Sequence, residues 1–199
     1  MATLTRPEPV AAAWAGRLIE RFMPRADVTE CHETLVHAPA DLVFEVARNF
    51  ELQSMPLVRG IFWLRAKLLH ATQPPERPQG LVAETTALGW GILAERPGRE
   101  LVVGSVTQPW KGNVVFRTVA PERFEAFSEP DLVKIVWTLE AEPLAPALTR
   151  FRTETRVLAT DDGARKQFRR YWRWAGLGAV LIRRLLLPAL RRVAERRAA

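Results

Sequence analysis

The last forty residues hold the feature that most constrains the fold, a basic and apolar segment that reads RKQFRRYWRWAGLGAVLIRRLLLPALRRVAERR from residue 165 to residue 197. At 100° per residue, its large apolar side chains gather on one broad side. This side consists of Phe168, Tyr171, Trp172, Ala175, Ala179, Ile182, Leu185, Leu186, Ala189, Leu190 and Val193. The opposite side, which we expect to face outward, carries Arg165, Arg169, Arg173, Arg183 and Arg184. The pattern predicts an amphipathic helix that lies on a domain.

Proline and glycine are expected to shape this helix. Pro188 has no backbone N–H and cannot bond to the carbonyl of residue 184, so we expect one long helix to about residue 187 and then a bent tail. Gly176 and Gly178 each cost the helix about 1 kcal/mol relative to alanine. A close approach of the backbone to a sheet or to a ligand would offset that cost.

The charge of the chain lies mainly in the same segment. Residues 162–199 carry ten Arg and one Lys against two acidic residues, a net charge of +9, so the remainder of the +7 chain is nearly neutral. The uncharged run at 174–182 is far shorter than the roughly 20 residues of a membrane span. Peripheral membrane contact through the basic helix stays open. We expect no nucleic-acid partner, because neither zinc-finger spacing nor a helix-turn-helix pattern accompanies the charge.

The composition is that of a globular protein, with 199 residues of which 48 % are hydrophobic. The single cysteine, Cys31, excludes an intrachain disulfide and a cysteine-based zinc site. His32, His37 and His70 do not have the spacing of metal ligands, and we expect neither a metal nor a cofactor. The N-terminus does not read as a secretory signal, so we expect a cytoplasmic protein.

The rest of the sequence predicts three helices and one strand before residue 71, and mainly strands after residue 80. In order, we expect a helix at 8–23, a strand at 27–38, helices at 39–50 and 56–70, a loop at 71–80 and strands from 81 to about 160. Alternation is clear near the end of this run, where Arg152, Glu154 and Arg156 share one face of a strand. We interpret that face as a solvated side of a sheet with cross-strand charge pairing.

This order of elements resembles the START-like or helix-grip superfamily, also called SRPBCC. The superfamily includes the birch pollen allergen, lipid-transfer START domains and polyketide cyclases. HAPADLVFEVARNF, at 37–50, is similar to its first strand running into its first short helix, and TRFRTETRVLATD with the final helix is similar to the ending of uncharacterised bacterial members. The resemblance covers about residues 27 to 190.

The resemblance implies an α+β fold in which a curved antiparallel β-sheet grips the long C-terminal α-helix, with short helices after the first strand. It also implies a largely apolar cavity between sheet and helix, often used to bind a hydrophobic small molecule. We therefore divide the chain into an N-terminal helical extension at 1–26 and a START-like helix-grip domain at 27–199.

Aromatic side chains are the best candidates for lining such a cavity, because ligand pockets are mostly apolar and aromatic. The predicted ligand-binding residues are Trp63, Glu84, Trp90, Trp110, Phe116, Trp137 and Trp172. Glu84 lies in the predicted strand LVAETTAL, where we expect it to face outward. An inward position would raise its pKa, as a general base requires. The sequence contains no nucleophile elbow, phosphate loop or dinucleotide fingerprint, and we name no catalytic residue.

We expect a non-enzymatic binder of a hydrophobic small molecule or lipid. Two alternatives stay open on the same fold. One is a polyketide cyclase- or hydrolase-like enzyme, which would place Glu84 or His37 in the pocket. The other is a peripheral membrane lipid-transfer protein that uses the basic helix as its contact surface. Neither the ligand nor the oligomeric state follows from the sequence.

Overall fold

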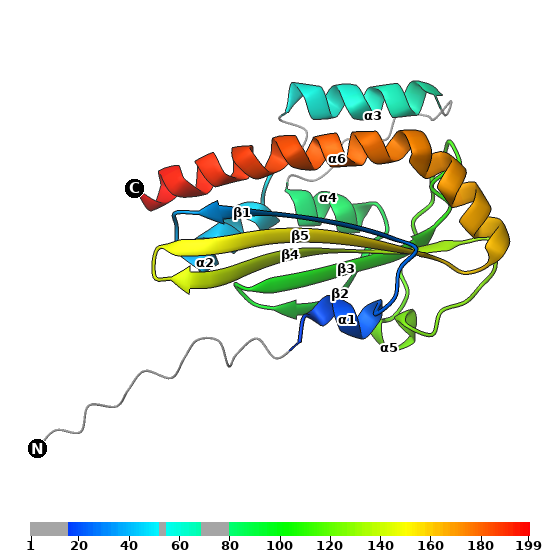
Figure 1. Ribbon diagram of the computed structural model, residues 1–199, viewed down its shortest axis with the longest axis horizontal. Coiled ribbons are helices and arrows are strands. Elements are labelled where there is room, and N and C mark those ends of the chain that lie inside the picture. The colour runs from blue at the N-terminus through cyan, green and yellow to red at the C-terminus, as the bar shows by residue number, and fades with distance from the viewer. Residues whose placement is uncertain (1–15, 52–54, 69–79) are drawn as a thin grey trace, which may run out of the picture.

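A computed structural model of the chain describes residues 16–51, 55–68 and 80–199. Within these residues, five antiparallel strands form one curved sheet in the order β1-β5-β4-β3-β2 (Figure 1). The strands are β1 (Val28–Val36), β2 (Gly91–Arg96), β3 (Glu100–Thr107), β4 (Val133–Ala145) and β5 (Leu148–Ala159). Because β1 pairs with β5, the first and last strands of the domain lie side by side.

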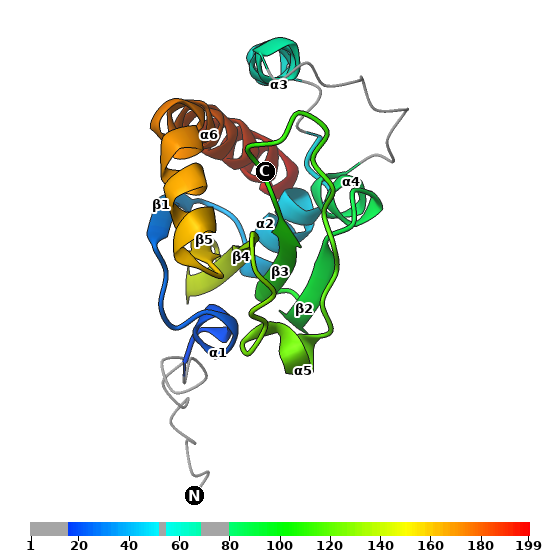
Figure 2. The same cartoon turned by 90° about the vertical axis from the view of Figure 1, so that its right-hand side faces the viewer.

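Helices lie on both sides of this sheet. They are α1 (Leu18–Phe22), α2 (Ala40–Arg48), α3 (Pro56–Leu68), α4 (Leu81–Ala87), α5 (Pro121–Phe124) and α6 (Asp162–Ala198). The long helix α6 runs along one face together with α2 and α4, whereas α1 and α5 lie against the opposite face (Figures 1 and 2). The chain has the helix-grip fold that the sequence led us to expect.

Two clusters of buried apolar side chains fix α6 to the sheet. The N-terminal cluster consists of Ala164 and Phe168 of α6 with Val133, Val157 and Ala159 of the sheet. The C-terminal cluster includes Leu187, Leu190 and Ala194 of α6 with Val43 and Phe44 of α2 and Leu101, Leu139 and Phe151 of the sheet. Since the two clusters lie near opposite ends of α6, the middle of the helix bridges the space between them.

The expectation of a bent tail after residue 187 is wrong, because α6 continues without interruption through Pro188 to Ala198. The helix changes direction in its orange, N-terminal part, and its C-terminal half runs straight (Figure 1). Pro188 is exposed, so water can bond to the carbonyl that the proline leaves unpaired. Leu187 and Leu190 are buried on either side of it, and their packing holds the helical path. None of the described helices, α6 included, has the length and apolar composition needed to cross a bilayer.

Three predicted strands have other structures, and one of them, at 123–129, contains the end of helix α5 and the turn that follows it. The segment LVAETTA forms helix α4, in which the Thr85 and Thr86 hydroxyls donate to the carbonyls of Leu81 and Val82 four residues earlier. A short apolar run with no clear period does not distinguish helix from strand, and here the helix is the outcome. The predicted strand at 114–120 makes one isolated bridge, between Arg117 and Val106.

Other predictions reach beyond the described residues. Helix α1 occupies the end of the helix expected at 8–23, while residues 8–15 lie outside the description. Residues 69–79 also lie outside it, and with them most of the predicted loop at 71–80.

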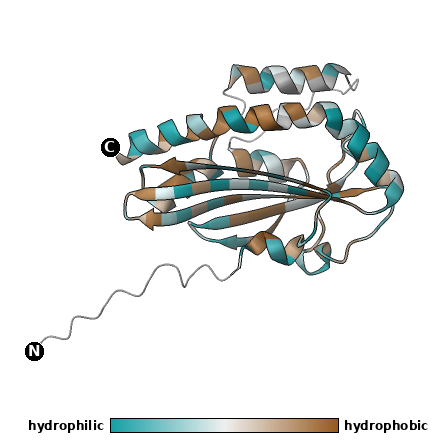
Figure 3. Ribbon diagram, in the orientation of Figure 1, coloured by the Kyte–Doolittle hydropathy of each residue, from teal (hydrophilic) through white to brown (hydrophobic). Residues whose placement is uncertain are grey.

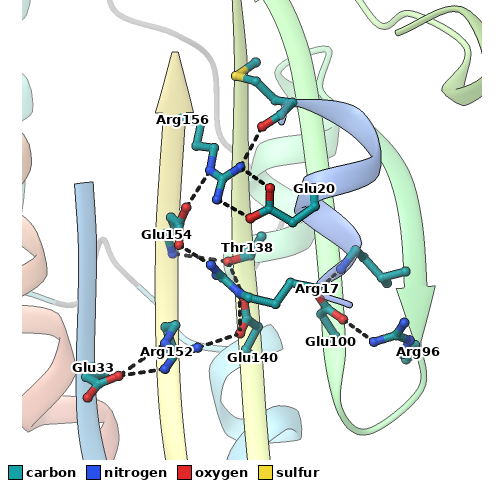
Figure 4. Close-up of polar contacts among 12 residues, drawn as sticks. Arg17, Glu20, Glu33, Arg96, Glu100, Thr138, Glu140, Arg152, Glu154 and Arg156 are labelled. Atoms are coloured by element: carbon teal, nitrogen blue, oxygen red, sulfur yellow. Dashed lines mark hydrogen bonds and ion pairs between the residues drawn. The ribbon is translucent and has the colours of Figure 1, made fainter. Parts of the chain in front are cut away.

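The charged face of β5 is covered, and the expectation of a solvated face is therefore wrong. The N-terminal segment crosses this side of the sheet, and Arg17 pairs there with both Glu140 of β4 and Glu154 of β5 (Figure 4). Helix α1 adds Glu20, which pairs with Arg156. Glu140 and Glu154 are only 2 % and 3 % exposed, so each carboxylate depends on its arginine partners for compensation.

The expected charge pairing across strands is present within this covered network. Arg152 of β5 lies 3.0 Å from Glu33 of β1 and 3.6 Å from Glu140 of β4, measured between nitrogen and carboxylate oxygen. Burial by itself raises the pKa of Glu154, but hydrogen bonds from Arg156 and Arg17 outweigh it and hold that pKa below its usual value. The network thus keeps Glu154 ionised at neutral pH.

Candidate functional site

The candidate site is the middle of the sheet face that α6 crosses. On the central strand β4, Val133 at the start of the strand and Leu139 at its middle lie on one face and are fully buried, Val133 in the N-terminal cluster and Leu139 in the C-terminal cluster. Ile135 and Trp137, at the two positions between them on the same face, are only partly buried. The face between the two clusters is therefore covered less completely than the face within them.

The neighbouring strand β5 repeats this pattern. Thr153 and Val157 are buried, and Thr155 between them is partly exposed. Strand pairing sets Thr155 opposite Trp137 on one side and opposite Glu30 of β1 on the other. The incompletely covered surface is thus a row across the sheet from Glu30 through Thr155 to Trp137.

A groove of about 550 Å³ opens at the β1 end of this row, between α6 and the edge strand. Its lining includes Trp172, Gly176, Val180, Leu181 and Arg184 of α6 together with Glu30 of β1. The volume lies within the range of about 300–1,000 Å³ that is typical of small-molecule sites. A mostly apolar lining with charged groups suits a ligand that has both apolar and polar parts.

Gly176 has a local role in shaping this groove. A Cβ at residue 176 would lie 3.0 Å from the indole of Trp172, one turn earlier on α6. The missing side chain therefore lets the Trp172 ring lie against its own helix. This close contact is with a side chain of α6, whereas the sequence suggested an approach to a sheet or a ligand.

Arg183 is the charged side chain of α6 that points toward the row. Its Nη2 donates a hydrogen bond to Thr155 Oγ1. Burial lowers the pKa of Arg183, and the negative charge of Glu30 opposes that shift. The expectation that Arg183 faces outward is wrong.

The buried stripe at the C-terminal end of α6 explains this error. Leu187, Leu190 and Ala194 follow the i, i+3, i+4 spacing of one helix face, and Arg183 lies one turn before Leu187 on the same face. The sequence analysis counted Leu185 as part of the apolar side, although it is only partly buried in the structure. Including it rotated the predicted apolar side around the helix axis and away from Arg183. The 3–4 spacing of the most apolar residues was the signal that could have placed Arg183.

His32 is a second polar group that sequence reasoning did not select. It lies on β1 beside Glu30, with its Nε2 3.6 Å from Glu30 Oε2. This nitrogen is buried and has no hydrogen-bond partner among the described residues. Burial, followed by the charge of Arg183, lowers the pKa of His32, so the imidazole is neutral at pH 7.

Three of the predicted aromatic residues, Trp90, Phe116 and Trp137, lie beside the C-terminal cluster. Trp90 and Trp137 both pack against the C-terminal cluster, and the Trp90 and Phe116 ring centroids are 5.1 Å apart. Gly89 permits this pair, since it has a φ of 100° and a Cβ there would lie 2.4 Å from the Phe116 carbonyl oxygen.

Two further predicted aromatic residues lie beside the N-terminal cluster. Trp110 and Trp172 pack against the N-terminal cluster, where the Trp172 ring stacks on Phe168 with centroids 5.4 Å apart. Of the five aromatic residues, Trp137 thus belongs to the row itself, Trp90, Trp110 and Trp172 pack against one of the two clusters, and Phe116 contacts Trp90. Their contact with a ligand stays a prediction.

Trp63 and Glu84 lie on helices outside this row. Trp63 of α3 is 57 % exposed, and its ring lies beneath the Lys67 ammonium at 5.1 Å. Glu84 lies on α4 and is only 8 % exposed, so the expectation that it faces outward is wrong. His37 is exposed, and its backbone N–H donates to Glu195 Oε1 at 3.0 Å. Among the described residues, no three His, Cys, Asp or Glu side chains are placed to hold a metal ion.

No protein-family model matches the sequence, and no curated protein matches it either. Similar solved structures include the Zhui aromatase/cyclase from Streptomyces sp. R1128, with 17 % identity, 86 % of this chain and 96 % of that chain covered, and a TM-score of 0.30. Another is protein CV1439 from Chromobacterium violaceum, with 13 % identity, 84 % and 96 % covered, and a TM-score of 0.36. A third is Ara h 8.0201, with 13 % identity, 80 % and 97 % covered, and a TM-score of 0.30. At such TM-scores these similarities decide nothing about function.

Proposed function

We propose that this protein binds a hydrophobic small molecule or lipid between the sheet and α6. The observation that carries the proposal is the incomplete cover over Ile135, Trp137 and Thr155, between two fully buried clusters. Exposed apolar surface costs about 25 cal/mol for each Å² that could be buried. A ligand that covers the indole of Trp137 recovers part of that free energy.

The groove between α6 and β1 supports the proposal because it adjoins the row at Glu30. Val180 and Leu181 provide apolar surface along it, and Glu30 belongs both to the groove and to the row. A ligand in the groove would therefore lie at the β1 end of the row, next to Thr155, which pairs with Glu30.

Titration with the uncharged fluorescent probe N-phenyl-1-naphthylamine tests the proposal. We expect enhanced fluorescence with the wild-type protein and an affinity about tenfold lower in Trp137→Ala, since a central aromatic anchor contributes at least about 1.4 kcal/mol. Leu144→Ala is the control, because Leu144 is exposed at the β4–β5 hairpin. A melting curve for each variant confirms that it is folded. An absent enhancement in the wild type, or equal affinities in all three proteins, contradicts the proposal.

A second candidate is a polyketide cyclase- or hydrolase-like enzyme, which the environment of His32 favours. A neutral imidazole with a free, buried nitrogen can accept a proton from a bound substrate. Cyclisation of methyl 3,5-dioxohexanoate to its pyrone, followed by ultraviolet absorbance, tests this candidate. A rate above that in buffer that is lost in His32→Gln supports it, and a rate equal to that in buffer counts against it.

A third candidate is a peripheral membrane protein that transfers lipid, which the exposed apolar residues of two neighbouring helices favour. Figure 3 shows hydrophobic residues along the middle of α6 and on α3, and the two helices lie side by side in Figures 1 and 2. The exposed ones are Leu57, Trp63 and Leu64 of α3 and Trp174, Leu177 and Leu181 of α6. Exposed Arg173 and Arg184 add positive charge that suits anionic lipid. Equal co-sedimentation with phosphatidylcholine vesicles and with vesicles that also contain phosphatidylglycerol would remove the role of charge.

A further inference from the structure

We propose that Arg183 binds the anionic group of an amphiphilic ligand, a carboxylate or a phosphate, whose apolar part lies over Ile135 and Trp137. This inference rests on the proposed binding function and names its ligand class. It assigns Arg183 the role of setting the preference for a charged head group.

The guanidinium of Arg183 has hydrogen-bonding capacity to spare. A guanidinium carries five N–H donors in a planar fork that matches carboxylate and phosphate oxygens. Within the described residues, the bond to Thr155 Oγ1 is the hydrogen bond that this side chain makes. Thr155 is a neutral partner, so the remaining N–H groups of Arg183 can still donate hydrogen bonds to an anion.

The charge of Arg183 is also poorly compensated in comparison with other partly buried arginines. Arg17 pairs with Glu140 and Glu154, and Arg156 pairs with Glu20 and Glu154. Arg183 forms no ion pair with any described residue.

Burial therefore dominates the environment of Arg183 and lowers its pKa, and the carboxylate of Glu30 opposes that shift. A cation that is removed from water without a partner is costly, and a ligand anion would supply that partner.

The position of Arg183 fits an amphiphile that lies along the row. Arg183 contacts Thr155, and Thr155 pairs directly with Trp137. A head group on the guanidinium therefore places the rest of the ligand beside the partly exposed indole. Glu30 lies on the other side of Thr155 and competes with the ligand for the positive charge.

Displacement of N-phenyl-1-naphthylamine by four twelve-carbon compounds tests the assignment. The compounds are dodecanoate, dodecyl phosphate, dodecanol and dodecyltrimethylammonium, each kept below its micelle concentration. We expect at least one anion to displace the probe from the wild type at a lower concentration than dodecanol, and the cation to be weakest. The two anionic arms distinguish a carboxylate ligand from a phosphate ligand.

Three variants make the test specific. Arg183→Gln should weaken the preferred anion by about tenfold or more, as expected for a charge-assisted hydrogen bond, and should leave dodecanol unchanged. Arg169→Gln removes an exposed charge from the same helix and is the control. Glu30→Gln should strengthen anion binding, because it removes the competing carboxylate. This variant decides the question if Arg183→Gln does not fold.

The outcomes separate the two proposals. If the probe does not bind, or if none of the four compounds displaces it, the proposed binding function fails and the assignment of Arg183 fails with it. If dodecanol displaces the probe as well as both anions do, the binding function stands and the role of Arg183 is overturned. An unchanged anion affinity in Arg183→Gln also overturns the role of Arg183. If Arg183→Gln does not fold, an unchanged anion affinity in Glu30→Gln overturns that role.

Discussion

Arg17 provides the sharpest test of how the N-terminal segment is attached to the sheet. Its guanidinium reaches Glu140 of β4 and Glu154 of β5, which are 123 and 137 residues away in the chain. The variant Arg17→Met keeps most of the apolar stem and removes the charge. Both carboxylates then stay buried with one fewer partner.

The size of the effect follows from the exposure of these groups. Loss of one partner from a buried ion pair costs about 3–5 kcal/mol. The Arg17 side chain is 26 % exposed, so water screens part of its interaction. Arg152 and Arg156 stay within 3.6 Å of Glu140 and 2.6 Å of Glu154, respectively, and compensate in part. We therefore expect unfolding free energy to fall by about 2–3 kcal/mol, which lowers Tm by about 5–10 °C in a domain of this size.

The loss should depend on pH with a defined sign. The pKa of Glu154 is lower in the folded protein than in the unfolded chain, where it is about 4.3. The stability that this carboxylate contributes is therefore present above about pH 4.3 and is lost as pH falls through the folded-state pKa. The difference between wild type and Arg17→Met should be largest near pH 7 and smaller below about pH 4.

Urea unfolding at pH 7 and at pH 3.5, followed by circular dichroism, measures this difference. The matched control is Arg21→Met, since Arg21 is exposed on α1 and should change stability by less than about 0.5 kcal/mol. A loss in Arg17→Met that is no larger than in this control refutes the reasoning. An equal loss at both pH values refutes its electrostatic part.

Three further substitutions test the packing around α6 and the sheet. Pro188→Ala should stabilise the protein by about 1–3 kcal/mol, because α6 is continuous there and gains a hydrogen bond; a lower Tm would contradict this. Leu190→Ala should cost about 2–5 kcal/mol in urea unfolding, since Leu190 is fully buried; a loss below about 1 kcal/mol would show that the C-terminal cluster is not formed. Gly104→Ala should cost about 1–3 kcal/mol, because its Cβ would lie 2.5 Å from Leu93 Cδ1 and 2.9 Å from the Phe124 ring; an unchanged melting curve would contradict that packing.

The sequence by itself determined the local elements with a clear period. The alternation at 133–139 and 151–157 lies in β4 and β5, and the basic apolar segment forms α6, beginning at Asp162 after the cap Asp161. The order of these elements, together with the resemblance of residues 37–50 and of the C-terminal segment to the START-like superfamily, implied the helix-grip architecture. Periodicity succeeds here because it reports the local conformation and the apolar side of each element, which depend on residues close in the chain.

Tertiary structure decided what covers each face and where the cover is incomplete. Arg152, Glu154 and Arg156 read as a solvated stripe, and only the fold brings Arg17 across it. Arg183 read as an outward charge, and only the docking of α6 brings it to Thr155, 28 residues earlier. Alternation in a strand reports which side chains share a face, but the neighbour of that face comes from a distant part of the chain. The environment of each charged group, and with it the candidate site, therefore had to come from the folded molecule.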